Sequence, residues 1–143
     1  MGIGRFAACV LVAGITQFAV GALFHVVVPV VAPTIPRQFA NAALFRPWDG
    51  WTSTYMALHP WGFGVLFAAA YLMLQHRGGG APMWRGGLAF GLGLFAVGSL
   101  PIFLLVLASM QVTPELIACW SIQNACQYAA AGAALGWFAA RSA

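Results

Sequence analysis

Two polar residues in the first long apolar stretch of the chain are the first candidates for chemistry. Gln17 and His25 lie within GITQFAVGALFHVVVP, residues 14–29, a run apolar enough to lie in lipid. With Gly14 and Gly21 they follow spacings of three and four residues, so they share one face of a helix. An amide or imidazole inside a membrane helix is costly unless it faces protein or water. We therefore expect this face to point into the molecule.

A second candidate lies in YMALHPWGFG, residues 55–64. Tyr55 and His59 are four residues apart and therefore share a helix face. Pro60 has no N–H group, so the carbonyl of Met56 loses its usual helical partner. The pattern predicts a kink with an exposed carbonyl beside His59.

The third candidate is a group of side-chain amides in CWSIQNACQY, residues 119–128. Gln123, Asn124 and Gln127 fall within five residues and lie on one face of a helix. An amide turned toward lipid would lose its hydrogen bonds to water without replacing them, which is costly. This helix is therefore also expected to turn its polar face inward.

The depths of these residues indicate where they meet. At 1.5 Å per residue, His25 lies roughly 6 Å and His59 about 12 Å below the outer ends of their stretches, a difference of about one helical turn. The amides lie roughly 13–20 Å below the same boundary. We therefore predict a ligand-binding pocket in the outer half of the molecule. Its lining is His25, His59, Gln123, Asn124 and Gln127, with Gln17 and Tyr55 at its margins.

Two interpretations of these polar residues stay open. In the first, the pocket holds a small hydrophobic ligand or a cofactor. One version is haem with His25 and His59 as axial ligands, and another is a chlorin magnesium on a single histidine. In the second interpretation, the side chains hydrogen-bond to one another and fix the packing of the helices, a contribution of about 0.6 kcal/mol each.

Catalysis and metal binding receive less support from the residue types. His59 could act as a general base on a lipid-soluble substrate, but the spacing shows no nucleophile–base pair, so the catalytic residues stay unknown. Apart from Glu115, the first residue of the last stretch, the long apolar stretches contain no acidic residue, which argues against a metal site or a proton-coupled transporter. Cys9, Cys119 and Cys126 show no CxxC spacing, so neither a zinc site nor a disulfide framework is predicted.

The composition of the chain is that of a membrane protein. Of its 143 residues, 62% are hydrophobic and 6% are charged, whereas soluble domains carry about 25% charged residues. A chain of this length is expected to form a single domain, residues 1–143. The net charge of +4 comes from isolated arginines, not from a basic cluster, so a nucleic-acid partner is not expected.

Four apolar stretches are long enough to cross a bilayer, and each must then be a helix. They are residues 6–28, 51–75, 86–110 and 115–140. The sequence thus predicts an all-α, multi-pass bundle of four transmembrane helices in the cell inner membrane. Arg5, Arg77, Arg85 and Arg141 would lie on one side, and Arg37, Arg46 and both acidic residues on the other. Because arginine favours the cytoplasmic side, the expected orientation is N-in and C-in.

The first connection, residues 29–50, is the only long one. Its segment PRQFANAALF, residues 36–45, is expected to form a short helix at the membrane interface. This helix could serve as a plain tether or as a lid over the outer end of the bundle.

Three classes of function fit these observations. The first is a membrane protein that binds a small hydrophobic ligand or cofactor, with lipid as its surroundings. The second is a non-catalytic accessory subunit of a larger membrane complex, or a homo-oligomer. The third is a bis-histidine haem protein for electron transfer, or a small enzyme with His59 as base. The GxxxG pairs Gly87–Gly91 and Gly132–Gly136 predict close helix packing in each case.

Overall fold

The computed structural model describes residues 2–41, 43, 45–46, 49–77 and 84–141, with the side chains of residues 75–77 left aside. Every regular element in this part of the chain is a helix, which confirms the all-α prediction there. The helices are α1 (Ile3–Val31), α2 (Thr34–Phe39), α3 (Gly50–Arg77), α4 (Trp84–Leu94), the π-helix η1 (Phe95–Ser99), α5 (Leu100–Ser109) and α6 (Pro114–Arg141).

Three helices are long and apolar enough to cross a membrane, which indicates a membrane protein. They are Ile3–Val31, Gly50–Leu74 and the continuous run Trp84–Ser109, which joins α4, η1 and α5. These helices coincide with the first three predicted spans. The fourth predicted span coincides with α6, which is 28 residues long but is not among the three. Its amides, together with Glu115 in its first turn, make α6 more polar than the others.

A proline explains the π-helical turn in the third long helix. Pro101 is the second residue after η1 and has no N–H to donate to the carbonyl of Val97. The N–H of Leu100 instead bonds to the carbonyl of Phe95, five residues earlier, which is the π-helical pattern. The chain therefore continues as one rod across this position.

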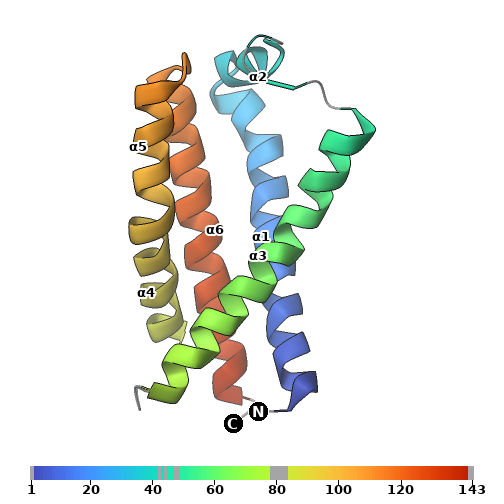
Figure 1. Ribbon diagram of the computed structural model, residues 1–143, viewed down its shortest axis with the longest axis vertical. Helices are drawn as coiled ribbons and strands as arrows, with labels where there is room; N and C mark the ends of the chain where they lie inside the picture. Colours follow the sequence, from blue (N-terminus) through green and yellow to red (C-terminus); the bar gives the residue numbers. More distant parts are fainter. Residues whose placement is uncertain (1, 42, 44, 47–48, 78–83, 142–143) are drawn as a thin grey trace.

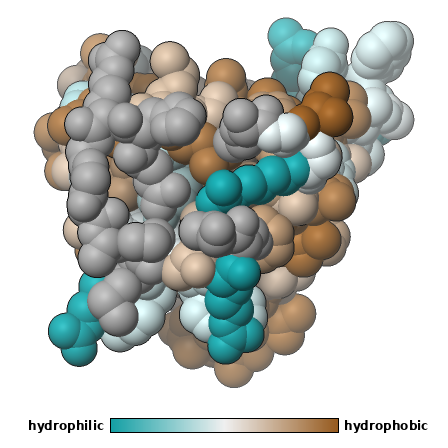
Figure 2. Space-filling view, turned by 90° about the horizontal axis from the view of Figure 1, so that it is seen from below, coloured by the Kyte–Doolittle hydropathy of each residue, from teal (hydrophilic) through white to brown (hydrophobic). Residues whose placement is uncertain are grey.

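Helix α6 contacts α1 on one side and α4 on the other, and α3 packs mainly against α1. Figure 1 shows α6 beside the α4–η1–α5 rod, while α3 crosses α1 in the half that holds both chain ends and leans away at the α2 end. Seen from the end with the termini, hydrophilic side chains lie between apolar ones (Figure 2).

Glycines make the contact between α4 and α6 close. A Cβ atom on Gly87 would overlap the carbonyl oxygen of Gly132, and one on Gly91 would overlap that of Tyr128. The two backbones therefore touch directly, as the GxxxG spacing predicts. Beside this contact, Phe67 of α3 packs edge-on against Phe90 and Tyr128, with ring centroids 5.1 Å and 5.8 Å away.

The short helix of the first connection lies earlier than the sequence indicates. It spans Thr34–Phe39, and residues 42 and 44 of the predicted segment 36–45 lie outside the described residues. Pro36 fits this earlier start because it lies in the first turn, where the N–H that proline lacks would have no helical partner. Ile35 is 2% exposed and packs with Val112, Leu116 and Ile117. Helix α2 therefore packs against the turn that precedes α6 and against the first turn of α6.

Candidate functional site

Two of the predicted amides join α1 to α6. Gln17 is 1% exposed and Gln127 is 8% exposed, so both are inside the protein. The Nε2 of Gln127 donates a hydrogen bond to the backbone carbonyl of Gln17 at 3.2 Å. A Cβ atom on Gly21 would lie 2.9 Å from the same Nε2, so the glycine provides the space in which the amide sits.

The other side-chain amides differ in their hydrogen bonds. The Nδ2 of Asn124 donates to the carbonyl of Trp120 in its own helix at 3.1 Å. Gln123 is half-buried beside Gly21. The Oε1 of Gln17 is buried and has no hydrogen-bond partner among the described residues. The amide face therefore serves partly as an interhelical seam, in line with the second interpretation of these residues.

The structure does not enclose the two histidines. His25 and His59 are both exposed, and Tyr55 is 66% exposed. A Cβ atom on Gly14 would lie 3.2 Å from the carbonyl oxygen of Pro60, which places His59 near the level of Gly14. His25 lies eleven residues beyond Gly14 on α1, about 16 Å further along the helix axis.

This separation differs from the expected single turn, and the tilt of α3 explains it. The expected depth of His59 holds only for an α3 that stands parallel to α1. Instead α3 leans away from α1 at its N-terminal end (Figure 1), so its first residues are not level with the end of α1. The two axial imidazoles of a haem bind the same iron atom, so they must lie at about the same depth in the bundle. The separation of His25 and His59 along the helix axis therefore does not fit haem between them.

No group of three His, Cys, Asp or Glu side chains that could hold a metal ion occurs in the part of the chain that the structure describes. His25 and His59 make no hydrogen bond to any described residue, so no orienting partner of the kind that a general base needs is present for His59 there.

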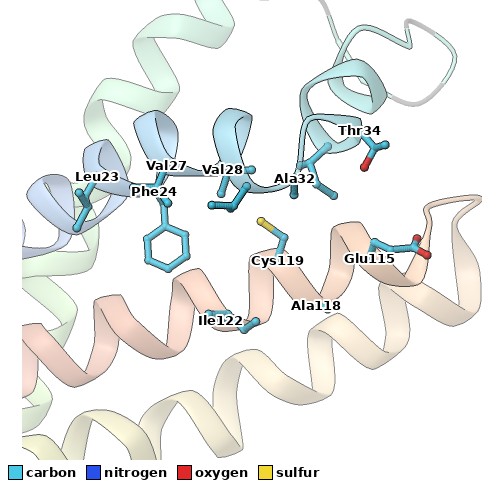
Figure 3. Close-up of a pocket in the computed structure, with 12 residues that line it drawn as sticks. Leu23, Phe24, Val27, Val28, Ala32, Thr34, Glu115, Ala118, Cys119 and Ile122 are labelled. Carbon is cyan, nitrogen blue, oxygen red and sulfur yellow. The ribbon is translucent and has the colours of Figure 1, made fainter.

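A cleft of about 550 Å³ lies between α1, α2 and α6 (Figure 3). Figure 3 shows the ring of Phe24 and the thiol of Cys119 in the space between α1 and α6, with Thr34 and Glu115 at the α2 end. The lining is Leu23, Phe24, Val27, Val28, Val31, Ala32, Thr34, Ile35, Glu115, Ala118, Cys119 and Ile122. Glu115 is its one charged side chain.

The predicted pocket and the observed cleft are different places. None of the seven predicted pocket residues lines the cleft, although α1 and α6 contribute to both. Sequence reasoning missed the cleft because its walls are apolar, and an apolar side chain at a helix surface has the same signature whether it faces a ligand or lipid. The available signal was Glu115, an acid next to the long apolar face of α6.

The charge of Asp49 is held at the start of α3. Asp49 precedes α3 and accepts hydrogen bonds at 3.0 Å from both the N–H and the Oγ1 of Thr52. These bonds, the backbone one first, lower the pKa of the Asp49 carboxyl below its ordinary value. Asp49 is therefore an N-cap of α3, and its charge is used structurally.

Comparison with known proteins finds no family model, curated protein or solved structure that matches this chain.

Proposed function

We propose that the protein is a multi-pass inner-membrane protein of four spanning helices that binds one apolar chain of a lipid or lipid-like molecule. The binding site is the cleft between α1, α2 and α6. Its volume of about 550 Å³ falls in the range of about 300–1,000 Å³ for ligand sites. Its apolar lining, with polar groups at one end only, is the observation that carries the proposal.

The contacts of α6 support its role as the fourth span. It runs antiparallel to α1 and contacts it through its C-terminal half, from Arg5 bonded to the carbonyl of Ala139 to the seam at Gln17 and Gln127. On its other side α4 packs closely against Gly132. Protein on both sides allows a helix with several amides to lie in the membrane, because its polar face does not meet lipid. The arginine distribution then favours N-in and C-in.

The polar end of the cleft sets the chemistry of the ligand. Transfer of an acyl chain from lipid to an apolar cleft gains little, because lipid tails are as apolar as the lining. Preference for a ligand must therefore come from shape and from its head. The Glu115 carboxylate and the Thr34 hydroxyl lie where that head would be, so a cationic or hydrogen-bond-donating head is the best fit.

Filling the cleft tests the proposal. The substitution Ala118→Phe adds a ring to the cleft wall, whereas Ala108→Phe adds the same ring to an exposed position of α5. Mass spectrometry of the extracted purified protein should show a retained hydrophobic molecule in wild type. We expect a loss of about tenfold in Ala118→Phe, which corresponds to about 1.4 kcal/mol, and no loss in Ala108→Phe. Equal retention by both variants would refute the cleft as the site.

A second candidate function is favoured by the surface of α5. No residue of α5 is buried, and Ile102, Leu104 and Leu105 are 58–65% exposed. A bare apolar face of this kind suits contact with lipid, and it also suits a partner helix in a larger complex. Blue-native electrophoresis of membranes tests this role: a discrete large assembly that disappears with Leu104→Lys supports it, and migration as the single chain opposes it.

A further inference from the structure

Two arginines converge at the end of the molecule that holds both termini. The Nη2 of Arg5, in the first turns of α1, donates to the carbonyl of Ala139 at 3.3 Å. Arg141 ends α6 only two residues later. Arg5 is therefore bonded to the last turn of α6, the turn that Arg141 ends.

A third arginine belongs to the same end. Arg85 lies in the first turn of α4, two residues before Gly87. Gly87 lies against Gly132 and Gly136 near the end of α6. The arginine end, as we name Arg5, Arg85 and Arg141, thus collects side chains from three helices. Figure 2 views this end and shows separate hydrophilic side chains with apolar surface between them.

No acidic side chain of the described residues compensates the positive charge of the arginine end. The chain has two acidic residues, Asp49 and Glu115, and both lie at helix starts at the α2 end. Neither α1 nor α4 carries an acid in its first turn. Three like charges at one end of the molecule raise the positive potential there and favour the binding of an anion from outside the protein.

Tryptophans position two of these arginines. The guanidinium carbon of Arg141 lies 3.9 Å from the ring centroid of Trp137, and that of Arg85 lies 5.5 Å from the ring of Trp84. Stacking on an aromatic face restrains the guanidinium plane and leaves its N–H edge free for hydrogen bonds. Tryptophan is also the residue that prefers the headgroup level of a bilayer.

We propose that the arginine end binds the phosphate group of an anionic phospholipid in the adjoining leaflet. Guanidinium N–H pairs match phosphate oxygens in geometry and charge. The exposed Trp84 and Trp137, 47% and 50% exposed, place these groups beside apolar surface, which a lipid can cover and a soluble anion cannot. This site lies at the opposite end from the cleft, and it does not depend on a ligand there.

The full chain, reconstituted in phosphatidylcholine vesicles, provides the test. Spin-labelled phosphatidylglycerol and spin-labelled phosphatidylcholine are compared for the fraction of lipid immobilised by the protein. The test variants are Arg85→Gln and the double variant Arg5→Gln/Arg141→Gln, and Arg5→Lys/Arg141→Lys keeps the charge. The matched control is Arg37→Gln/Arg46→Gln, because both of these arginines are exposed and lie outside the arginine end.

We expect wild type to prefer phosphatidylglycerol, with a loss of about fivefold for each arginine removed, the factor typical of one basic residue near an anionic surface. The lysine variant should retain part of the preference, and the control should retain all of it. Equal immobilisation of both lipids by wild type would refute the proposal, as would an equal loss in the control. Displacement of the lipid by inorganic phosphate, but not by chloride at equal ionic strength, would also refute it, because it would show a small-anion site. If the double variant does not accumulate, Arg85→Gln alone decides.

Discussion

The side-chain amide of Gln127 donates to the backbone carbonyl of Gln17 at 3.2 Å, deep between α6 and α1. The amide oxygen of Gln17 itself is buried without a partner among the described residues. The two glutamines thus differ in what they contribute, although both are polar residues on inward helix faces. One makes a bond between helices, and the other leaves an acceptor unused.

This difference predicts opposite effects for two similar substitutions. Gln127→Leu removes the interhelical donor and should cost about 0.6 kcal/mol of stability, the mean for such bonds in membranes. Gln17→Leu removes an unpaired acceptor and keeps the backbone carbonyl, so it should be neutral or stabilising by about 1 kcal/mol. Thermal unfolding in detergent measures both. A Gln17→Leu variant less stable than Gln127→Leu would show that the Gln17 amide oxygen has a partner.

The close contact between α4 and α6 predicts a strong positional effect for alanine. A Cβ atom on Gly91 would overlap the carbonyl of Tyr128, whereas nothing lies within 4 Å of a Cβ on Gly93. We expect Gly91→Ala to destabilise the protein by about 1–3 kcal/mol through overpacking. Gly93→Ala should be neutral or stabilising, because alanine is the better helix former. Thermal unfolding in detergent measures the change in stability for both variants. Equal changes would contradict the close packing of Gly91 against α6.

The hydrogen bond that holds α2 is open to a local test. The Oγ1 of Thr113 donates to the Oε1 of Gln38 at 2.8 Å, and it also accepts from the N–H of Leu116 at 3.3 Å. Gln38→Leu removes only the first bond, so hydrogen exchange in residues 34–39 should rise about fivefold, the factor for about 1 kcal/mol. Thr113→Val removes both bonds, so exchange should also rise at the start of α6. Ser109→Ala is the control, because Ser109 bonds only to the carbonyl of Leu105 in its own helix.

The N-cap of α3 predicts a weak dependence of stability on pH. Hydrogen bonds from Thr52 lower the pKa of Asp49 below its ordinary value of 3.8. A carboxyl whose pKa is lower in the folded state stabilises the fold above the unfolded pKa. That contribution is lost as the pH falls through the folded pKa, so it should fade below about pH 4. Unfolding temperatures measured on both sides of this range should fall less in Asp49→Asn, which can still cap the helix but does not titrate.

The sequence indicates the helices well and the site poorly. Length and apolarity locate the three long apolar helices because both are properties of a single segment. The seam at Gln17 and Gln127 is also foreseeable, since buried amides seek partners on neighbouring helices. The distance between His25 and His59 cannot be foreseen from the sequence, because it depends on the tilt of α3. That tilt arises from packing at Gly14 and Pro60. The cleft cannot be predicted from the sequence either, because its apolar walls have the same residue types as any lipid-facing surface.

The central place of α6 has a consequence for how the molecule is made. It is the long helix that carries the most amides, and α1 and α4 flank it. A segment of this polarity partitions into a bilayer less readily than the other three when it leaves the translocon. On the proposal that α6 spans the membrane, its stable insertion therefore requires that α1 and α4 are already in place to contact its polar and glycine faces. Insertion of α6 is then a cooperative event, because an error in α1 or α4 removes the surface against which its amides and glycines pack.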